Sequence, residues 1–291
     1  MGVCDSNENS NNFSASKMVT EENNIKEDYQ RENFRDNKFI PIDLINKAAK
    51  SVCKVICNLN GLNVKGTGFF MNIPDNSLKC LITNYHIISE KTKEIQIEIH
   101  NKKNINLILD VNNRFIQYFD EPLDITVIQI KDKEWDIIQN VEFLDYDMNY
   151  VIGYEQYKDS YIFALGYPYG DEIVTGTGKI INIKNNYGFE HNIPTDKGCS
   201  GSPIILLNYS KVIKIIGVHK GESIKRMNEI NIVTFIGKIV DKIKTIRMKN
   251  YNLNKAKIDK SKKVKEMEIK NTLRKKIIII LLQSLIFRKI T

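Results

Sequence analysis

The sequence has few cysteines, and their pattern excludes two ways of stabilising a small domain, by disulfides or by a bound metal. There are five of them, an odd number, and they show neither the spacing of metal ligands nor a dense disulfide framework. No apolar signal sequence opens the chain. We therefore expect a reduced, intracellular protein, in the cytoplasm or at the cytoplasmic face of a membrane, with no metal site and no cofactor. The cysteines are Cys4, Cys53, Cys57, Cys80 and Cys199.

Apolar runs long enough to cross a membrane are also missing. The stretch from Ile277 to Phe287 is mostly Ile and Leu but has only eleven residues. As a helix it would be about 16 Å long, whereas a hydrocarbon core is about 30 Å thick. Two interpretations stay open, packing on the folded domain or lying in a membrane surface beside the preceding lysines. The composition, 42% apolar and 27% charged, is typical of soluble globular proteins.

The net charge of +8 is unevenly distributed. Residues 1–37 contain four Lys or Arg and eight acidic residues, whereas residues 249–276 contain eleven basic and three acidic ones. The first segment is rich in Asn, Glu and Ser, which predicts a flexible extension. We divide the chain into this extension (1–37), a folded domain (38–248) and a basic C-terminal tail with a short apolar segment (249–291). The tail lacks interleaved aromatic residues, so nucleic acid is not an expected partner.

The first residues, MGVCDS, fit the pattern for N-myristoylation, with Gly2 exposed once the initiator methionine is removed and Ser6 four residues later. Cys4 is a candidate for palmitoylation. One myristoyl chain binds a bilayer only marginally, whereas two lipids, or one lipid and a basic patch, give stable attachment. We therefore expect acylation at Gly2 and Cys4 and a membrane surface as a partner.

The folded domain reads as a series of short strands. Pro41 to Lys50 predicts a short helix, and Val- and Ile-rich runs separated by Asn, Gly, Asp and Lys turns follow it. Glu94 to His100 and Ile105 to Val111 alternate cleanly and predict a hairpin. Ile230 to Met248 has apolar residues at helical spacing and predicts a closing helix. Further strands are expected at Val52 to Leu59, Asp124 to Ile130, Tyr161 to Leu165, Gly178 to Ile183, Ile204 to Leu207 and Val212 to His219. The pattern indicates an all-β barrel or sandwich.

A short glycine-rich turn, GCSGSP from Gly198 to Pro203, is the first candidate functional motif. Two glycines and a proline pin a tight loop, which can hold Ser200 at a fixed angle with the amides of Gly198 and Ser200 pointing the same way. Acyl transfer needs such donors where negative charge develops. Taken alone, the motif is equally compatible with a structural turn between two strands.

A serine nucleophile needs a base and a group that orients the base, and candidates for both stand upstream. LITNYHII places His86 just after a buried strand, behind the GTGFF run at Gly66 to Phe70. LDITVIQI places Asp124 at the start of an apolar strand, where a carboxylate requires a partner. Asp110 and Asp120 are rivals, but only Asp124 leads directly into the apolar run.

These motifs, in this order, resemble the chymotrypsin-like (trypsin-fold) serine proteases, over roughly Lys50 to Lys244. The resemblance implies two six-stranded antiparallel β-barrels with the active site between them. It also implies that His86 is the general base, Asp124 orients it, Ser200 attacks a protein or peptide substrate, and the amides of Gly198 and Ser200 form the oxyanion hole. Cys199 occupies the position where secreted digestive enzymes carry an aspartate, so activation by a cut N-terminus is not expected, and Cys199 should face away from the substrate.

The pattern looks closest to the bacterial glutamyl endopeptidases and, more distantly, to the high-temperature-requirement proteases. In the former, a threonine before the nucleophile and a histidine in the following strand line the specificity pocket, and Thr195 and His219 match these positions. This implies cleavage after Glu or Asp. Glu222, which stands where a glycine is expected, argues against that preference, and His100 and His191 read as ordinary strand residues. The alternative function is a catalytically inactive, protease-like binding scaffold at a membrane.

Overall fold

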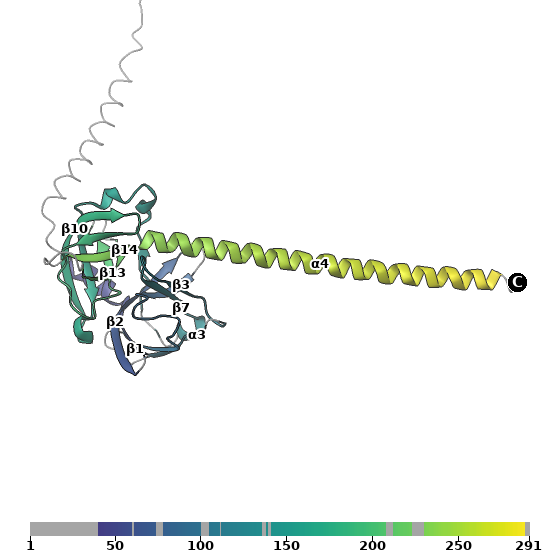
Figure 1. The fold of residues 1–291 in the computed structure, drawn as a ribbon, viewed down its shortest axis with the longest axis horizontal. Coiled ribbons are helices and arrows are strands. Elements are labelled where there is room, and N and C mark those ends of the chain that lie inside the picture. Colours follow the sequence, from purple (N-terminus) through teal and green to yellow (C-terminus); the bar gives the residue numbers. More distant parts are fainter. Residues whose placement is uncertain are drawn as a thin grey trace, which may run out of the picture. The chain divides into compact units, whose positions relative to one another are not determined.

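The computed structural model describes residues 40–59, 61–73, 78–99, 105–110, 112–135, 138, 141–207, 212–222 and 230–288. The acylation candidates Gly2 and Cys4 lie outside these residues. The chain divides into two compact units, Met1–Ile239 and Val240–Thr291. The first unit contains all the described strands and every candidate catalytic residue, and Figure 1 shows its two sheets.

The N-terminal sheet has seven antiparallel strands in the order β5-β4-β1-β2-β3-β7-β6. Helix α2 (Ile42–Ala49) precedes it and the short α3 (Asp132–Trp135) follows it. Strand β4 follows from the alternation of apolar and polar residues. Its residues Ile95, Ile97 and Ile99 are buried, while the residues between them are partly exposed. The strands are β1 (Val52–Leu59), β2 (Leu62–Ile73), β3 (Leu78–Thr83), β4 (Glu94–Ile99), β5 (Ile105–Ile108), β6 (Ile116–Phe119) and β7 (Ile125–Gln129).

The C-terminal sheet closes on itself. Its order is β12-β9-β10-β11-β14-β13, and a further pairing of β12 with β13 completes a six-stranded barrel, to which β8 is added in parallel along β13. Its strands are β8 (Asp145–Tyr146), β9 (Tyr161–Gly166), β10 (Val174–Asn185), β11 (Gly188–His191), β12 (Pro203–Leu206), β13 (Lys214–Glu222) and β14 (Asn231–Phe235). The described residues include the 3₁₀ turns η2 (Met148–Val151), η3 (Glu155–Tyr157) and η4 (Pro168–Gly170).

The predicted all-β, trypsin-like class is confirmed, with one refinement and one error. The first sheet is a half-barrel, since its end strands β5 and β6 do not pair with each other in the described part of the chain. The closing helix expected from Ile230 to Met248 does not form over its first residues. Asn231–Phe235 is strand β14, which pairs with β11 on one side and β13 on the other, and α4 begins only at Ile236. Pairing on both sides outweighs the helical spacing of the apolar residues.

Contacts between the two sheets converge on the loops that carry the candidate catalytic residues. The amide of Thr67 in β2 donates to the carbonyl of Ser200 at 2.8 Å. The hydroxyl of Thr234 in β14 donates to the carbonyl of Leu123, beside Asp124, at 2.6 Å. Lys220 in β13 forms an ion pair with Glu121 in the same loop. The sheets are therefore tied together at the site.

The second unit is described by the helix α4 (Ile236–Arg288), which runs into it from the first unit. All side chains from Tyr251 to Arg274 are exposed. The segment expected to be a basic tail is therefore helical over its described length. Among the described residues, no helix is both long enough and apolar enough to span a membrane.

Candidate active site

His86 and Asp124 meet because their strands are neighbours. His86 follows the end of β3 and Asp124 precedes the start of β7, and β3 and β7 are antiparallel with Thr83 opposite Thr126. The two loops therefore lie at the same edge of the sheet. Oδ2 of Asp124 lies 2.7 Å from Nδ1 of His86, and Oδ1 of Asp124 accepts the backbone amide of His86 at 2.9 Å. Both carboxylate oxygens are thus used to hold one histidine.

The backbone around Asp124 fixes this arrangement. Asp124 is only 2% exposed and has a φ of +54°, a left-handed conformation that aspartate tolerates better than most residues. Its amide donates to the carbonyl of Asp120, and its own carbonyl accepts from Nδ2 of Asn84 at 2.9 Å. The rival Asp110 instead accepts from the amide of Asn112 in its own loop. The structure therefore brings Asp124 to His86 and leaves Asp110 in a local turn.

Ser200 lies in the turn between β11 and β12 and is partly exposed. Its hydroxyl is 3.4 Å from the carbonyl of Lys220 in β13. Gly66, the first glycine of the GTGFF run, lies against both catalytic turns. A Cβ there would come within 2.1 Å of Cδ1 of Ile87 and 3.3 Å of the carbonyl oxygen of Ser200. Glycine at this position is what allows the nucleophile turn and the residue after His86 to approach the same strand.

The two amides expected to form an oxyanion hole are available. In the nucleophile turn, the amides of Cys199, Gly201 and Ser202 donate to the carbonyls of Asp196, His219 and Cys199. The amides of Gly198 and Ser200 have no acceptor among the described residues. Gly198 has a φ of +98°, and a Cβ on it would lie 2.4 Å from the carbonyl oxygen of Tyr167, so only glycine fits. The turn therefore presents two unpaired donors, as stabilisation of a developing oxyanion requires.

Cys199 is buried, with 6% of its surface exposed. Burial is the main cause that raises the pKa of its thiol. A Cβ on Gly166 of β9 would lie 3.5 Å from its sulfur, which places the thiol against that strand. The reactive species of cysteine is the thiolate, and this environment disfavours it. Of the two adjacent candidates, only Ser200 is accessible to a substrate.

The residues expected to line a specificity pocket form a chain of hydrogen bonds in the barrel. His219 in β13 is 2% exposed, and its Nδ1 lies 3.4 Å from Nε2 of His191 in β11. The other ring nitrogen of His191, Nδ1, accepts the amide of Ile193 at 3.0 Å. The hydroxyl of Thr195 lies 2.9 Å from Oδ1 of Asn231, whose Nδ2 donates to the carbonyl of Ile193 at 2.8 Å.

Both histidines are held neutral. Desolvation first and the nearby His86 second lower the pKa of His219 to about 4. The pKa of His191 is also lowered, by burial first and by His219 second. The sequence pattern predicts an ordinary strand residue at His191 and singles out nothing at Asn231. A signal that could have found His191 is the small number of histidines. The chain has four, and three of them, His86, His191 and His219, lie near one another.

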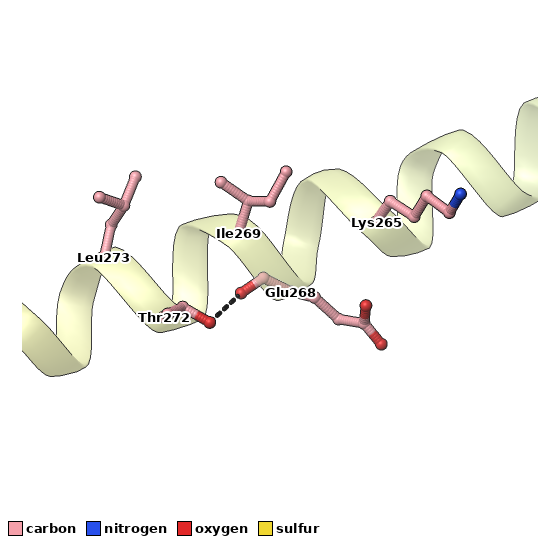
Figure 2. Close-up of a pocket in the computed structure, with 5 residues that line it drawn as sticks. All are labelled: Lys265, Glu268, Ile269, Thr272 and Leu273. Atoms are coloured by element: carbon pink, nitrogen blue, oxygen red, sulfur yellow. Dashed lines mark hydrogen bonds between the residues drawn. The ribbon is translucent and has the colours of Figure 1, made fainter.

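One hollow on the described surface is not part of this site. It is lined by Lys265, Glu268, Ile269, Thr272 and Leu273, all on the exposed side of α4 (Figure 2). The hydroxyl of Thr272 donates to the carbonyl of Glu268 at 2.9 Å, a bond within the helix. All of these residues belong to one helix, so the hollow has no opposite wall and does not enclose a ligand. No group of three or more His, Cys, Asp or Glu residues in the described part of the chain is arranged to hold a metal ion.

Comparisons with known proteins agree with the fold. Residues 66–214, just over half of the chain, match the trypsin-like peptidase domain. The chain therefore belongs to the trypsin-like peptidase family. Among the curated proteins there is no significant match.

Solved structures of proteases show the same fold. The inactive form of a serine-to-alanine mutant of Rv3671c from M. tuberculosis H37Rv is 15% identical, with a TM-score of 0.51, over 73% of this chain and 94% of that chain. A serine endoprotease from Yersinia pestis is 14% identical, with a TM-score of 0.53, over 71% and 67%. The HtrA-type protease AlgW, solved with a tripeptide, is 14% identical, with a TM-score of 0.53, over 70% and 62%. At these identities the likeness establishes the fold alone.

Proposed function

We propose that this protein is a serine endopeptidase that hydrolyses peptide bonds through an acyl-enzyme. Oγ of Ser200 attacks the scissile carbonyl carbon while its proton passes to Nε2 of His86. The same proton then goes to the leaving amine, which departs and leaves the acyl group on Ser200. Water, deprotonated by His86, releases the acid and restores the serine.

The observation that carries the proposal is the double contact between Asp124 and His86. With Oδ2 of Asp124 at 2.7 Å, the proton of the neutral imidazole is held on Nδ1, and Nε2 is left with a lone pair. The amide contact at 2.9 Å fixes the position of the histidine along the chain. General base catalysis requires a histidine in the correct tautomer and orientation, and these two contacts hold His86 in that state.

The free amides of Gly198 and Ser200 provide the second support. An unpaired amide is costly unless solvent or a ligand satisfies it, and the three other amides in this turn all have acceptors. Two donors on residues flanking Cys199 suit the single oxygen of a tetrahedral intermediate. A binding scaffold that has lost turnover does not require this arrangement, and no observation on the described residues favours that alternative.

We further propose that the enzyme prefers Glu, or Asp, before the cleaved bond. Because Nδ1 of His191 accepts from Ile193, the proton of the neutral ring is on Nε2, which faces Nδ1 of His219. His219 therefore carries its own proton on Nε2 and offers a neutral donor from the barrel interior. A buried neutral donor suits a carboxylate, since it binds the anion without requiring a buried cation.

Two other residues bear on this preference. The hydroxyl of Thr195 must turn away from Oδ1 of Asn231 before it can donate to a substrate. Glu222, whose charge would repel an acidic side chain, is exposed and lies at the end of β13 opposite Asn231. Exposure lets water screen its charge, so its effect on acidic substrates should be moderate and dependent on salt.

The experiment that tests both parts of the proposal is a cleavage profile of the full chain on a peptide library, with Ser200→Ala as the blank. We expect hydrolysis by the wild type only, concentrated after Glu and then Asp. A wild type with no more hydrolysis than the blank overturns the proposed activity. Hydrolysis after other residues in preference to Glu and Asp overturns the specificity alone.

A further inference from the structure

The side chain and backbone of Thr67 hold the nucleophile turn from the opposite sheet. Thr67 lies in β2, within the GTGFF run, and is completely buried. Its hydroxyl donates to the carbonyl of Gly198 at 2.8 Å and accepts the amide of Tyr167 at 3.0 Å. Its amide donates to the carbonyl of Ser200 at 2.8 Å. Three of its hydrogen bonds therefore cross between the sheets, and one side-chain oxygen takes part in two of them.

These bonds reach the same two residues whose amides are free. The carbonyls of Gly198 and Ser200 are both bound by Thr67, and the amides of Gly198 and Ser200 are both unpaired among the described residues. The carbonyl of Gly198 shares a peptide plane with the amide of Cys199, and the carbonyl of Ser200 shares one with the amide of Gly201. The bonds from Thr67 therefore fix the two planes that flank the plane carrying the amide of Ser200, and one of them also adjoins the plane carrying the amide of Gly198. We propose that Thr67 is the positioning residue for the oxyanion hole, an inference that rests on the proposed peptidase activity.

The nucleophile turn is packed tightly against its neighbours, in addition to the hydrogen bonds that its own amides make. A Cβ on Gly201 would lie 1.9 Å from the carbonyl oxygen of Thr67, so the turn lies directly against β2. A Cβ on Gly198 would meet the backbone of Tyr167 and Tyr169. Tyr167 is thus a neighbour of the turn, and its amide is bound to the same hydroxyl of Thr67. The hydroxyl connects the loop after β9 with the nucleophile turn.

Thr67 is suited to this task because it combines a donor, an acceptor and a rigid side chain. A β-branched side chain has few rotamers in a strand, so the oxygen is held in place. Valine has nearly the same shape but lacks the oxygen, and its substitution leaves the carbonyl of Gly198 and the amide of Tyr167 without a buried partner. Serine keeps the oxygen and loses only a methyl group. Comparing the two variants therefore separates the effect of losing the hydrogen bonds from the effect of losing the packing of the methyl group.

Thr83 provides a matched control. Its hydroxyl donates to the carbonyl of Thr67 at 2.7 Å, and it is also completely buried, in β3. Thr83→Val therefore removes one buried hydroxyl bonded to the same residue but leaves the bonds from Thr67 to the turn in place. Any general loss of stability from removing a hydroxyl here should appear in both variants. Only the Thr67 variant should affect catalysis selectively.

The test compares wild type, Thr67→Val, Thr67→Ser and Thr83→Val in the full chain, with kcat and KM measured on one cleaved peptide and the unfolding midpoint measured in parallel. Because loss of one oxyanion donor lowers kcat by about 10²- to 10³-fold, misplacing the donors in Thr67→Val should lower kcat by about 10- to 100-fold. We expect KM to change less than about threefold, Thr67→Ser to restore kcat to within about fivefold of wild type, and Thr83→Val to keep it.

A folded Thr67→Val protein with the kcat of wild type overturns the inference, and so does an equal loss of kcat in Thr83→Val. If Thr67→Val does not fold, Thr67→Ala replaces it, with the same expected loss of kcat and the same recovery in Thr67→Ser. A wild type that cleaves while every Thr67 variant keeps full kcat overturns only the role of Thr67. A wild type that does not cleave overturns the proposed function, and this inference with it.

Discussion

The rings of His191 and His219 lie against each other inside the second barrel, with Nε2 of the first 3.4 Å from Nδ1 of the second and the ring planes inclined at 65°. The strands that carry them, β11 and β13, are separated by β14. Both rings are buried and neutral, and the amide of Ile193 decides which nitrogen of His191 carries the proton. The pair therefore has consequences for stability as well as for substrate recognition.

Acid should destabilise the fold through this pair. The pKa of His219 is lowered to about 4, whereas an unfolded histidine titrates near pH 6.5, so the unfolded chain binds more protons between these values. The stabilisation is complete above about pH 6.5 and is lost as the pH falls toward 4. Between pH 7 and pH 5, this histidine alone should account for about 2 kcal/mol of the free energy of unfolding.

Urea unfolding of wild type and His219→Gln at pH 7 and pH 5 measures this effect. Glutamine keeps a hydrogen-bonding side chain but does not titrate, so the variant should lose less stability over this pH range than wild type. Equal losses in the two proteins would show that His219 does not carry the dependence.

Replacing Asp124 by asparagine should nearly abolish turnover while leaving substrate binding in place. The amide cannot hold the proton on Nδ1 of His86, so the imidazole loses its correct tautomer, and kcat should fall by about 10³- to 10⁴-fold. Asp110→Asn is the control, because that carboxylate caps its own loop and should keep kcat within about twofold. A similar kcat in the two variants would mean that Asp124 is not the orienting group.

Thiol reagents should not inhibit the native enzyme. The sulfur of Cys199 is buried and its pKa is raised, so it reacts slowly despite standing next to Ser200. Wild type incubated with iodoacetamide at neutral pH should keep its activity, and mass spectrometry should find Cys199 modified only after unfolding in urea. Rapid inactivation with carbamidomethylation at Cys199 would assign the nucleophile to the thiol instead.

Acylation at Gly2 and Cys4 stays a prediction. If it occurs, Gly2→Ala should move the protein from the membrane fraction of cells to the soluble one, and Cys4→Ser should do so in part, since one lipid binds only marginally. The eleven basic residues between 249 and 276 should make the remaining attachment sensitive to salt. Wild type and Gly2→Ala with the same distribution would exclude the lipid anchor.

Local patterns were enough to predict much of the fold. The strand Val52–Leu59 and the pairing of β4 with β5 follow from alternation and turn residues alone. For Asn231–Phe235 the local pattern predicts helix, because its apolar residues continue at helical spacing into α4. Its structure is decided by pairing with β11 on one side and β13 on the other. These strands are distant in sequence, so a local pattern does not reveal the pairing.

The same distinction applies to the site. His86, Asp124 and Ser200 stand in motifs, and each could be named from its neighbours in the chain. The contribution of Thr67 could not, because its partners Gly198 and Ser200 are more than a hundred residues away and belong to the other sheet. His191 was missed for a similar reason, since its neighbour His219 reaches it across β14.

The most direct test of the central claim is covalent labelling with a fluorophosphonate, which reacts only with a serine activated by a base and an oxyanion hole. Full-length wild type, Ser200→Ala and His86→Ala are incubated with the probe at neutral pH, and the labelled peptide is identified by mass spectrometry. The account predicts one label, on Ser200, in wild type and none in the two variants. Folded wild type that stays unlabelled, or that is labelled elsewhere, would contradict it.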